Sequence, residues 1–179
     1  MRDARVALCP PAETLEQPLN ARCFAAQLPR AVKKRRWHLA IDLHLRPDSG
    51  QAHRRAEEID RSQAKSGTTH FHAYATCTIV HPSRRYTVAL TRVEKGTAWV
   101  EVLKRLLRRA RRSGVRPDLL RLDRGFYSVA IIRSLQAARD PFIMPAILRG
   151  RKAAHPKGPS GTRVFALWER SGGSSDTLT

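Results

Sequence analysis

Two aspartates each follow an apolar run with the character of a buried strand. Asp42 comes directly after residues 37–41, and Asp123 directly after residues 118–122. The end of a strand, next to a loop or a helix start, is where α/β folds usually hold their reactive groups. Carboxylate oxygens are also the ligands that Mg²⁺ and Mn²⁺ prefer. The two residues therefore indicate metal-assisted chemistry.

The charge balance indicates what such a site would act on. The chain has 34 Lys and Arg against 15 Asp and Glu, which gives a formal net charge of +19 at pH 7. Most of these cations are Arg, whose planar guanidinium can donate two hydrogen bonds to one phosphate. The expected partner is a polyanion, and the bonds to be attacked would be phosphodiesters of nucleic acid.

Several classes of protein are disfavoured by the same sequence. Cys9, Cys23 and Cys77 lie far apart, without the paired spacing of a disulfide framework or a thiolate zinc site. No apolar run approaches the roughly 18–20 residues of a membrane span, and residues 1–20 lack the apolar core of a signal peptide. We therefore expect a cytoplasmic, nucleoid-associated protein with no membrane partner.

The residue pattern predicts an α/β domain. Seven elements are expected in the order β-β-β-α-β-α-β, over residues 37–45, 67–80, 84–93, 100–112, 118–122, 127–138 and 142–144. The second and third strands read as an antiparallel hairpin. Residues 46–66 are nearly free of large apolar side chains and predict a polar loop or a short exposed helix.

An antiparallel opening followed by a βαβ unit implies a mixed sheet flanked by helices. This order resembles the ribonuclease-H-like fold, in which the first and fourth strands lie side by side. Asp42 and Asp123 would then meet, although they are distant in sequence. Residues 1–36 read as a poorly ordered basic lead-in, and residues 166–179 as a flexible Gly/Ser tail.

Four stretches resemble DDE transposases of the IS4-like superfamily, nearest to the insertion-sequence ISH3 type. They are AKSGTTHFHAYAT (64–76), RYTVALTRVEKG (85–96), RLDRGFYS (121–128) and FIMPAILRGRK (142–152). The resemblance runs from about residue 38 to 163. It implies a transposase DDE domain over residues 37–165, acting on DNA in transposition by metal-dependent phosphodiester hydrolysis and strand transfer.

The resemblance also implies roles for individual residues. Asp42 would bridge two divalent ions, Mg²⁺ or Mn²⁺, and Asp123 would hold one of them. The DNA partners would be insertion-sequence ends and a target, with a homodimer on DNA as one arrangement. The residues expected to contact DNA are basic: Lys65, Arg124, Arg149, Arg151 and Lys152.

The family's third acid, a Glu on a downstream helix, has no clear counterpart before Thr179. Glu169 is the nearest Glu, and its surroundings do not match the family pattern. We therefore expect a partial, C-terminally incomplete domain of transposase or nuclease type, without a full catalytic triad, that binds metal weakly and has little or no turnover alone.

Other interpretations fit the same residues. Asp42 could be a strand-end acid paired with an Arg, and Asp123 a helix N-cap or the partner of Arg124. At the level of function, the chain could be a catalytically silent basic nucleic-acid-binding protein. It could also be an unrelated basic RNA- or DNA-binding module, which predicts that the two aspartates lie far apart.

Overall fold

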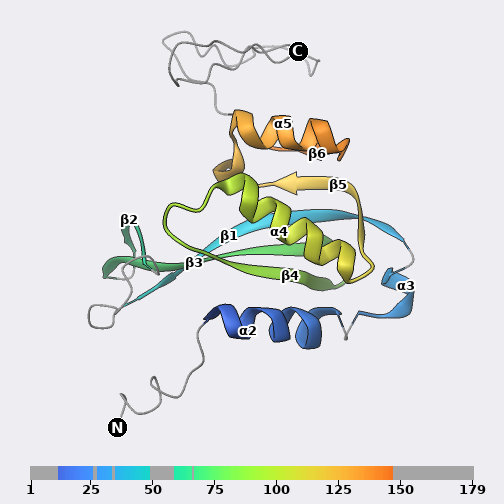
Figure 1. The fold of residues 1–179 in the computed structure, drawn as a ribbon, viewed down its shortest axis with the longest axis horizontal. Coiled ribbons are helices and arrows are strands. Elements are labelled where there is room, and N and C mark those ends of the chain that lie inside the picture. The colour runs from blue at the N-terminus through green and yellow to red at the C-terminus, as the bar shows by residue number, and fades with distance from the viewer. Residues whose placement is uncertain (1–11, 26–27, 34, 49–58, 66, 147–179) are drawn as a thin grey trace.

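The computed structural model describes residues 12–25, 28–33, 35–48, 59–65 and 67–146. Its described strands form one mixed sheet in the order β2-β3-β1-β5-β6, with β4 also paired to β3 (Figure 1). The strand bounds are β1 Arg36–Pro47, β2 Asp60–Lys65, β3 Thr68–Val80, β4 Arg85–Val93, β5 Arg116–Leu122 and β6 Phe142–Ile143. The helices are α2 Ala12–Leu19, α3 Arg30–Lys33, α4 Trp99–Arg112 and α5 Val129–Ala138, with shorter turns η1 Asn20–Ala25 and η3 Arg124–Phe126.

The centre of the sheet is β1, which pairs antiparallel with β3 and parallel with β5. Alternate side chains of a strand point to opposite faces, and in β1 Leu39 and Ile41 are buried while their neighbours are half-buried or exposed. The first and fourth predicted strands are thus adjacent, as in the ribonuclease-H-like fold. The predicted α/β class, a mixed sheet flanked by helices, is confirmed.

One face of the sheet is covered by α4 and α5. The apolar residues of α4 recur at helical spacing, so that Leu103 and Leu106 are buried while its basic side chains, apart from Arg109, are exposed. They belong to one core cluster with Ile41 of β1 and Leu135 of α5. Figure 1 shows α4 crossing in front of the strands and α5 lying beside β5 and β6.

The opposite face of the sheet is much less buried. Among the described residues, the even-numbered positions of β1 and β3 on this face are half-buried or exposed, including Asp42, His44 and Thr76. The face that carries Asp42 is therefore the face turned away from α4.

The described part of the N-terminal segment differs from the poorly ordered lead-in that the sequence predicts. The amide of Asn20 donates to the Leu90 carbonyl at 2.8 Å and accepts from the Leu90 N–H at 2.8 Å. These two bonds pair the backbone N–H and carbonyl of Leu90 at the free edge of β4. In addition, Leu28 and Val32 belong to the core cluster. Residues without clear periodicity are thus held in place by contacts with distant strands.

The segment 46–66, predicted as a loop or a helix, also differs where the structure describes it. Asp60–Lys65 forms β2, which pairs antiparallel with the first residues of β3. The strand contains no large apolar residue, so its formation depends on backbone pairing with the long strand beside it. None of the helices in the described residues is long and apolar enough to cross a membrane.

Candidate functional site

The register of β1 and β5 brings Asp42 and Asp123 together. The parallel pairing ends with Ile41 opposite Leu122, and the Asp123 N–H donates to the Ile41 carbonyl at 3.3 Å. Neighbouring strands lie about 4.8 Å apart, so the next residue on each strand lies beside the other. The two aspartates therefore lie side by side, Asp123 directly after the last residue of β5 and Asp42 within β1, and both are exposed.

The carboxylate of Asp42 has no cationic partner of the Arg or Lys type among the described residues. Its Oδ1 accepts a hydrogen bond from the Leu43 N–H at 2.9 Å. Its Oδ2 lies 3.7 Å from Nε2 of His44, which is also 3.0 Å from Oγ1 of Thr76. Within the part of the chain that the structure describes, Asp42 therefore does not have the structural role of an acid paired with an Arg.

Asp123 does have a local structural role, as the N-cap of η3. Its Oδ1 accepts from the Arg124 N–H at 2.6 Å, and its carbonyl accepts from the Phe126 N–H at 3.0 Å. The cap uses a single carboxylate oxygen, and a carboxylate offers about four lone-pair sites. In both aspartates, Oδ1 thus accepts a hydrogen bond from the N–H of the following residue, and Oδ2 takes no part in that bond.

The donor set fits a hydrated hard cation. Mg²⁺ usually keeps several waters and is held by one or two carboxylates, which is what Asp42 and Asp123 offer. A closed site, such as a structural zinc site, needs four protein ligands. No group of three or more His, Cys, Asp or Glu in the described part of the chain could hold a metal ion. Glu169 lies outside the described residues.

The thiol of Cys77 is an unsuitable ligand or nucleophile. It lies in β3 within the core, and burial raises its pKa from 9.0 to about 12. A thiol must lose its proton to act as a nucleophile or a metal ligand, so Cys77 serves as a small apolar core residue. This agrees with the oxygen-ligand chemistry that the sequence indicates.

The residues expected to contact DNA are only partly described. Arg124 is exposed beside Asp123, and its side chain forms no ion pair within the described residues. Lys65 ends β2, but its side chain is not among those described. Arg149, Arg151 and Lys152 lie outside the described residues.

A groove beside Asp42 adds residues that sequence reasoning missed. It has a volume of about 730 Å³ and lies between the open sheet face and the turn that joins β3 to β4. His44 and Thr76 line it near Asp42, and Arg84 and Arg85 line it from the turn. The two-residue period of a strand places His44 on the Asp42 face, a signal that was available in the sequence. The two arginines reach the groove only through the pairing of β3 with β1.

Comparisons with known proteins give one structural likeness. No family model matches the chain, and no curated protein matches it. The fold is similar to part of a chain in the cryo-EM structure of a piggyBac transposase synaptic complex with hairpin DNA, with a TM-score of 0.42 and 14% sequence identity. The match covers 74% of this chain and 28% of that chain.

Proposed function

We propose that the chain is part of the catalytic domain of a DDE-type DNA transposase, of the IS4-like superfamily and the ISH3 type. The proposed domain spans residues 37–165. One observation carries the proposal, namely that Asp42 and Asp123 lie side by side on adjacent parallel strands. The RLDRGFYS block around Asp123 and the net charge of +19 support it.

The proposed chemistry is attack on a phosphodiester. A pair of divalent ions, Mg²⁺ or Mn²⁺, would activate the attacking oxygen and stabilise the leaving oxygen. Asp42 would contribute oxygens to both ions and Asp123 to one. The N–H groups of Leu43 and Arg124 hold one oxygen of each carboxylate, at 2.9 Å and 2.6 Å. This limits the rotation of both side chains before any ligand binds, which lowers the entropic cost of binding.

The partners that go with this function are also proposals. They are DNA at insertion-sequence ends and at a target, with a homodimer assembled on the DNA. The location would be the cytoplasm, at the nucleoid. Lys65, Arg124, Arg149, Arg151 and Lys152 are the proposed DNA contacts.

A second candidate is a catalytically silent nucleic-acid-binding protein. The observation that favours it is that the described residues supply two neighbouring carboxylates and no third. Under this alternative the chain binds DNA through its cations, and the aspartates have only local roles such as the N-cap at Asp123. An unrelated basic module, by contrast, predicts distant aspartates and does not agree with their adjacency.

A nicking assay distinguishes these functions. Supercoiled plasmid is incubated with the full chain and Mn²⁺, with EDTA as a blank, and the relaxed form is quantified. Because the described residues supply only two neighbouring carboxylates, we expect only weak nicking by the wild type, and its loss in Asp42→Ala and in Asp123→Ala. Asp118→Ala is the matched control, because Asp118 is an exposed aspartate on β5 that pairs with His38 at 3.6 Å.

Each result has a definite meaning. Nicking that survives both Asp42→Ala and Asp123→Ala would remove the two-aspartate mechanism. DNA binding by the wild type without any Mn²⁺-dependent nicking would favour the silent protein. Equal loss in Asp118→Ala would mean that the effect comes from general damage to the sheet.

A further inference from the structure

The outer surface of α4 carries a row of arginines on the side of the molecule away from Asp42. Arg105, Arg108 and Arg112, called here the Arg row, are all exposed. At 3.6 residues per turn they lie within about 60° of one another around the helix axis and extend over about 10 Å along it. The Arg row is therefore one continuous line of charge on the surface.

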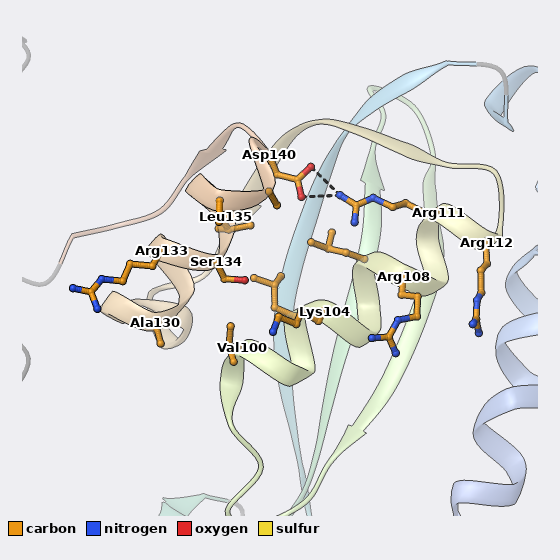
Figure 2. Close-up of a pocket in the computed structure, with 14 residues that line it drawn as sticks. Val100, Lys104, Arg108, Arg111, Arg112, Ala130, Arg133, Ser134, Leu135 and Asp140 are labelled. Atoms are coloured by element: carbon orange, nitrogen blue, oxygen red, sulfur yellow. Dashed lines mark hydrogen bonds and ion pairs between the residues drawn. The ribbon is translucent and has the colours of Figure 1, made fainter. Parts of the chain in front are cut away.

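The arginines of α4 fall into two groups. Arg109 forms an ion pair with Glu16 and donates to the Leu90 carbonyl at 2.6 Å. Arg111 donates to both carboxylate oxygens of Asp140, at 2.9 Å and 2.7 Å, as Figure 2 shows. These two side chains connect the helix to other elements.

The Arg row has no such attachment. Within the described part of the chain, its three side chains take part in no ion pair or hydrogen bond. An unpaired guanidinium keeps all of its donors available for an outside partner. The Arg row therefore carries positive charge that no described residue of the chain neutralises.

Grooves flank the Arg row on both sides. The groove between α4 and α5 has a volume of about 1140 Å³ and is lined by apolar side chains such as Leu107 together with Arg108 and Arg112 (Figure 2). The groove between α4 and the α2–η1 segment has a volume of about 650 Å³ and is lined by all three residues of the Arg row. Arg108 and Arg112 therefore lie on the ridge that separates these two grooves.

The positive surface continues past the C-terminal end of α4. A third groove there, of about 630 Å³, is lined by five cations and Gly114; the cations are Lys33, Arg35, Arg36, Arg111 and Arg116. Among the described residues that line these grooves the one acid is Asp140, and it is already paired with Arg111. No unpaired acid among the described residues lines these grooves, so the net field is positive along the whole path.

We propose that the Arg row and the cations at the end of α4 form a second binding surface, which takes the phosphate backbone of duplex DNA. Arg is suited to this because its planar fork can donate two hydrogen bonds to one phosphate. The length of the Arg row matches about three phosphates, at 3.4 Å of rise per nucleotide on one strand. Contacts of this kind bind any sequence and weaken steeply with salt.

This surface is separate from the proposed catalytic site. The helix α4 packs on the buried face of the sheet through Leu103 and Leu106, whereas Asp42 lies on the opposite face. The proposal goes beyond the proposed function, because binding at α4 needs neither metal nor the two aspartates. It holds equally for an active transposase and for a silent DNA-binding protein.

The test is the salt dependence of DNA binding by the full chain in EDTA. The probe is a fluorescent duplex of mixed sequence, about 20 base pairs long, and binding is followed by anisotropy at several salt concentrations. The test variant combines Arg105→Gln, Arg108→Gln and Arg112→Gln. The control variant combines Arg30→Gln, Lys95→Gln and Arg139→Gln, which removes the same charge from exposed positions that line none of these grooves.

We expect the test variant to bind about tenfold more weakly or worse at fixed salt, with a slope of log K against log salt reduced by roughly two to three. The control variant should retain most of the slope. Unchanged binding in the test variant, or an equal loss in both variants, would overturn the proposal. Thermal melts of both variants establish that they fold.

The two proposals fail separately. The combined variant Asp42→Asn and Asp123→Asn should keep the wild-type salt slope and lose Mn²⁺-dependent nicking. A normal slope without nicking in the wild type would contradict the proposed catalysis and leave the Arg row intact. A large loss of slope in this aspartate variant would contradict the separation of the two surfaces.

Discussion

Asp123 donates its backbone N–H to the carbonyl of Ile41 at 3.3 Å, and this bond is the point where two distant parts of the chain meet at the candidate site. It continues the parallel pairing of β5 with β1 by one residue beyond the Ile41–Leu122 pair. On β1, Asp42 is the residue directly after Ile41, so it lies beside Asp123. Because the sheet fixes this arrangement, the adjacency of the two aspartates is a property of the fold.

The two roles of Asp123 can be separated by substitution. Asp123→Ala removes the N-cap of η3 and should lower the free energy of unfolding by about 1 kcal/mol. Asp123→Asn keeps a side-chain acceptor for the Arg124 N–H and should leave stability nearly unchanged. Urea denaturation of both variants checks this. Both should lose Mn²⁺-dependent nicking, and a loss confined to the Ala variant would mean that Asp123 acts only as a cap.

The ion pair between Glu16 and Arg109 should matter for stability. Both side chains are largely buried, with exposed fractions of 13% and 22%, and Glu16 also accepts from Thr91 Oγ1 at 2.7 Å. Glu16→Ala leaves the Arg109 charge without its counter-ion, so we expect a loss of about 3 kcal/mol or more in urea denaturation.

The control for this loss is an exposed pair on the same helix. Glu101→Ala breaks the contact of Glu101 with Lys104, at 3.2 Å, where both side chains are about half exposed. Such a pair contributes only about 0.5 kcal/mol or less. A loss in Glu16→Ala that is no larger than in Glu101→Ala would contradict the anchoring of α2 on the sheet.

The core thiol should be inert in the folded protein. Burial raises the pKa of Cys77 from 9.0 to about 12, so below pH 9 it stays protonated in both the folded and the unfolded state. Between pH 9 and 12 the unfolded thiol ionises while the folded one keeps its proton, so this group lowers the free energy of unfolding as pH rises.

A variant with Cys9→Ser and Cys23→Ser isolates this thiol for measurement. At pH 8 an aromatic disulfide reagent should not react with Cys77 until denaturant unfolds the chain. Its stability between pH 9 and 11 should also fall more steeply than that of the variant with Cys77→Ala in addition. Rapid labelling under native conditions would contradict the buried position of Cys77 in β3.

Much of the fold is predictable from the sequence, because its central elements have strong periodicity. The apolar residues of α4 recur at helical spacing, and β1 and β3 alternate, so each pattern indicates both the element and its buried face. The segment at β2 gave no such signal, since Asp60–Lys65 contains no large apolar residue. Asn20 was likewise unpredictable, because its partner is the edge of a strand 70 residues away.

The candidate site, too, was predictable from the sequence only in part. The adjacency of Asp42 and Asp123 follows from the predicted strand order, since the first and fourth strands of that order lie side by side. The approach of Arg84 and Arg85 depends on how the hairpin packs, which local pattern does not give. Within α4 the sequence shows a basic face but not which arginines are paired, because Glu16 and Asp140 come from other segments.

The most direct test of the central claim is Mn²⁺ binding, followed by the electron paramagnetic resonance signal of the free ion. We predict that the full chain binds Mn²⁺ and so lowers the signal of the free ion. Asp42→Asn and Asp123→Asn should each weaken the affinity for Mn²⁺ about tenfold or more. The combined variant should be little worse than either one, because both residues serve one site. Asp118→Asn should bind like the wild type. Equal Mn²⁺ binding by the wild type and the combined variant, or no binding by either, would contradict a metal site formed by Asp42 and Asp123.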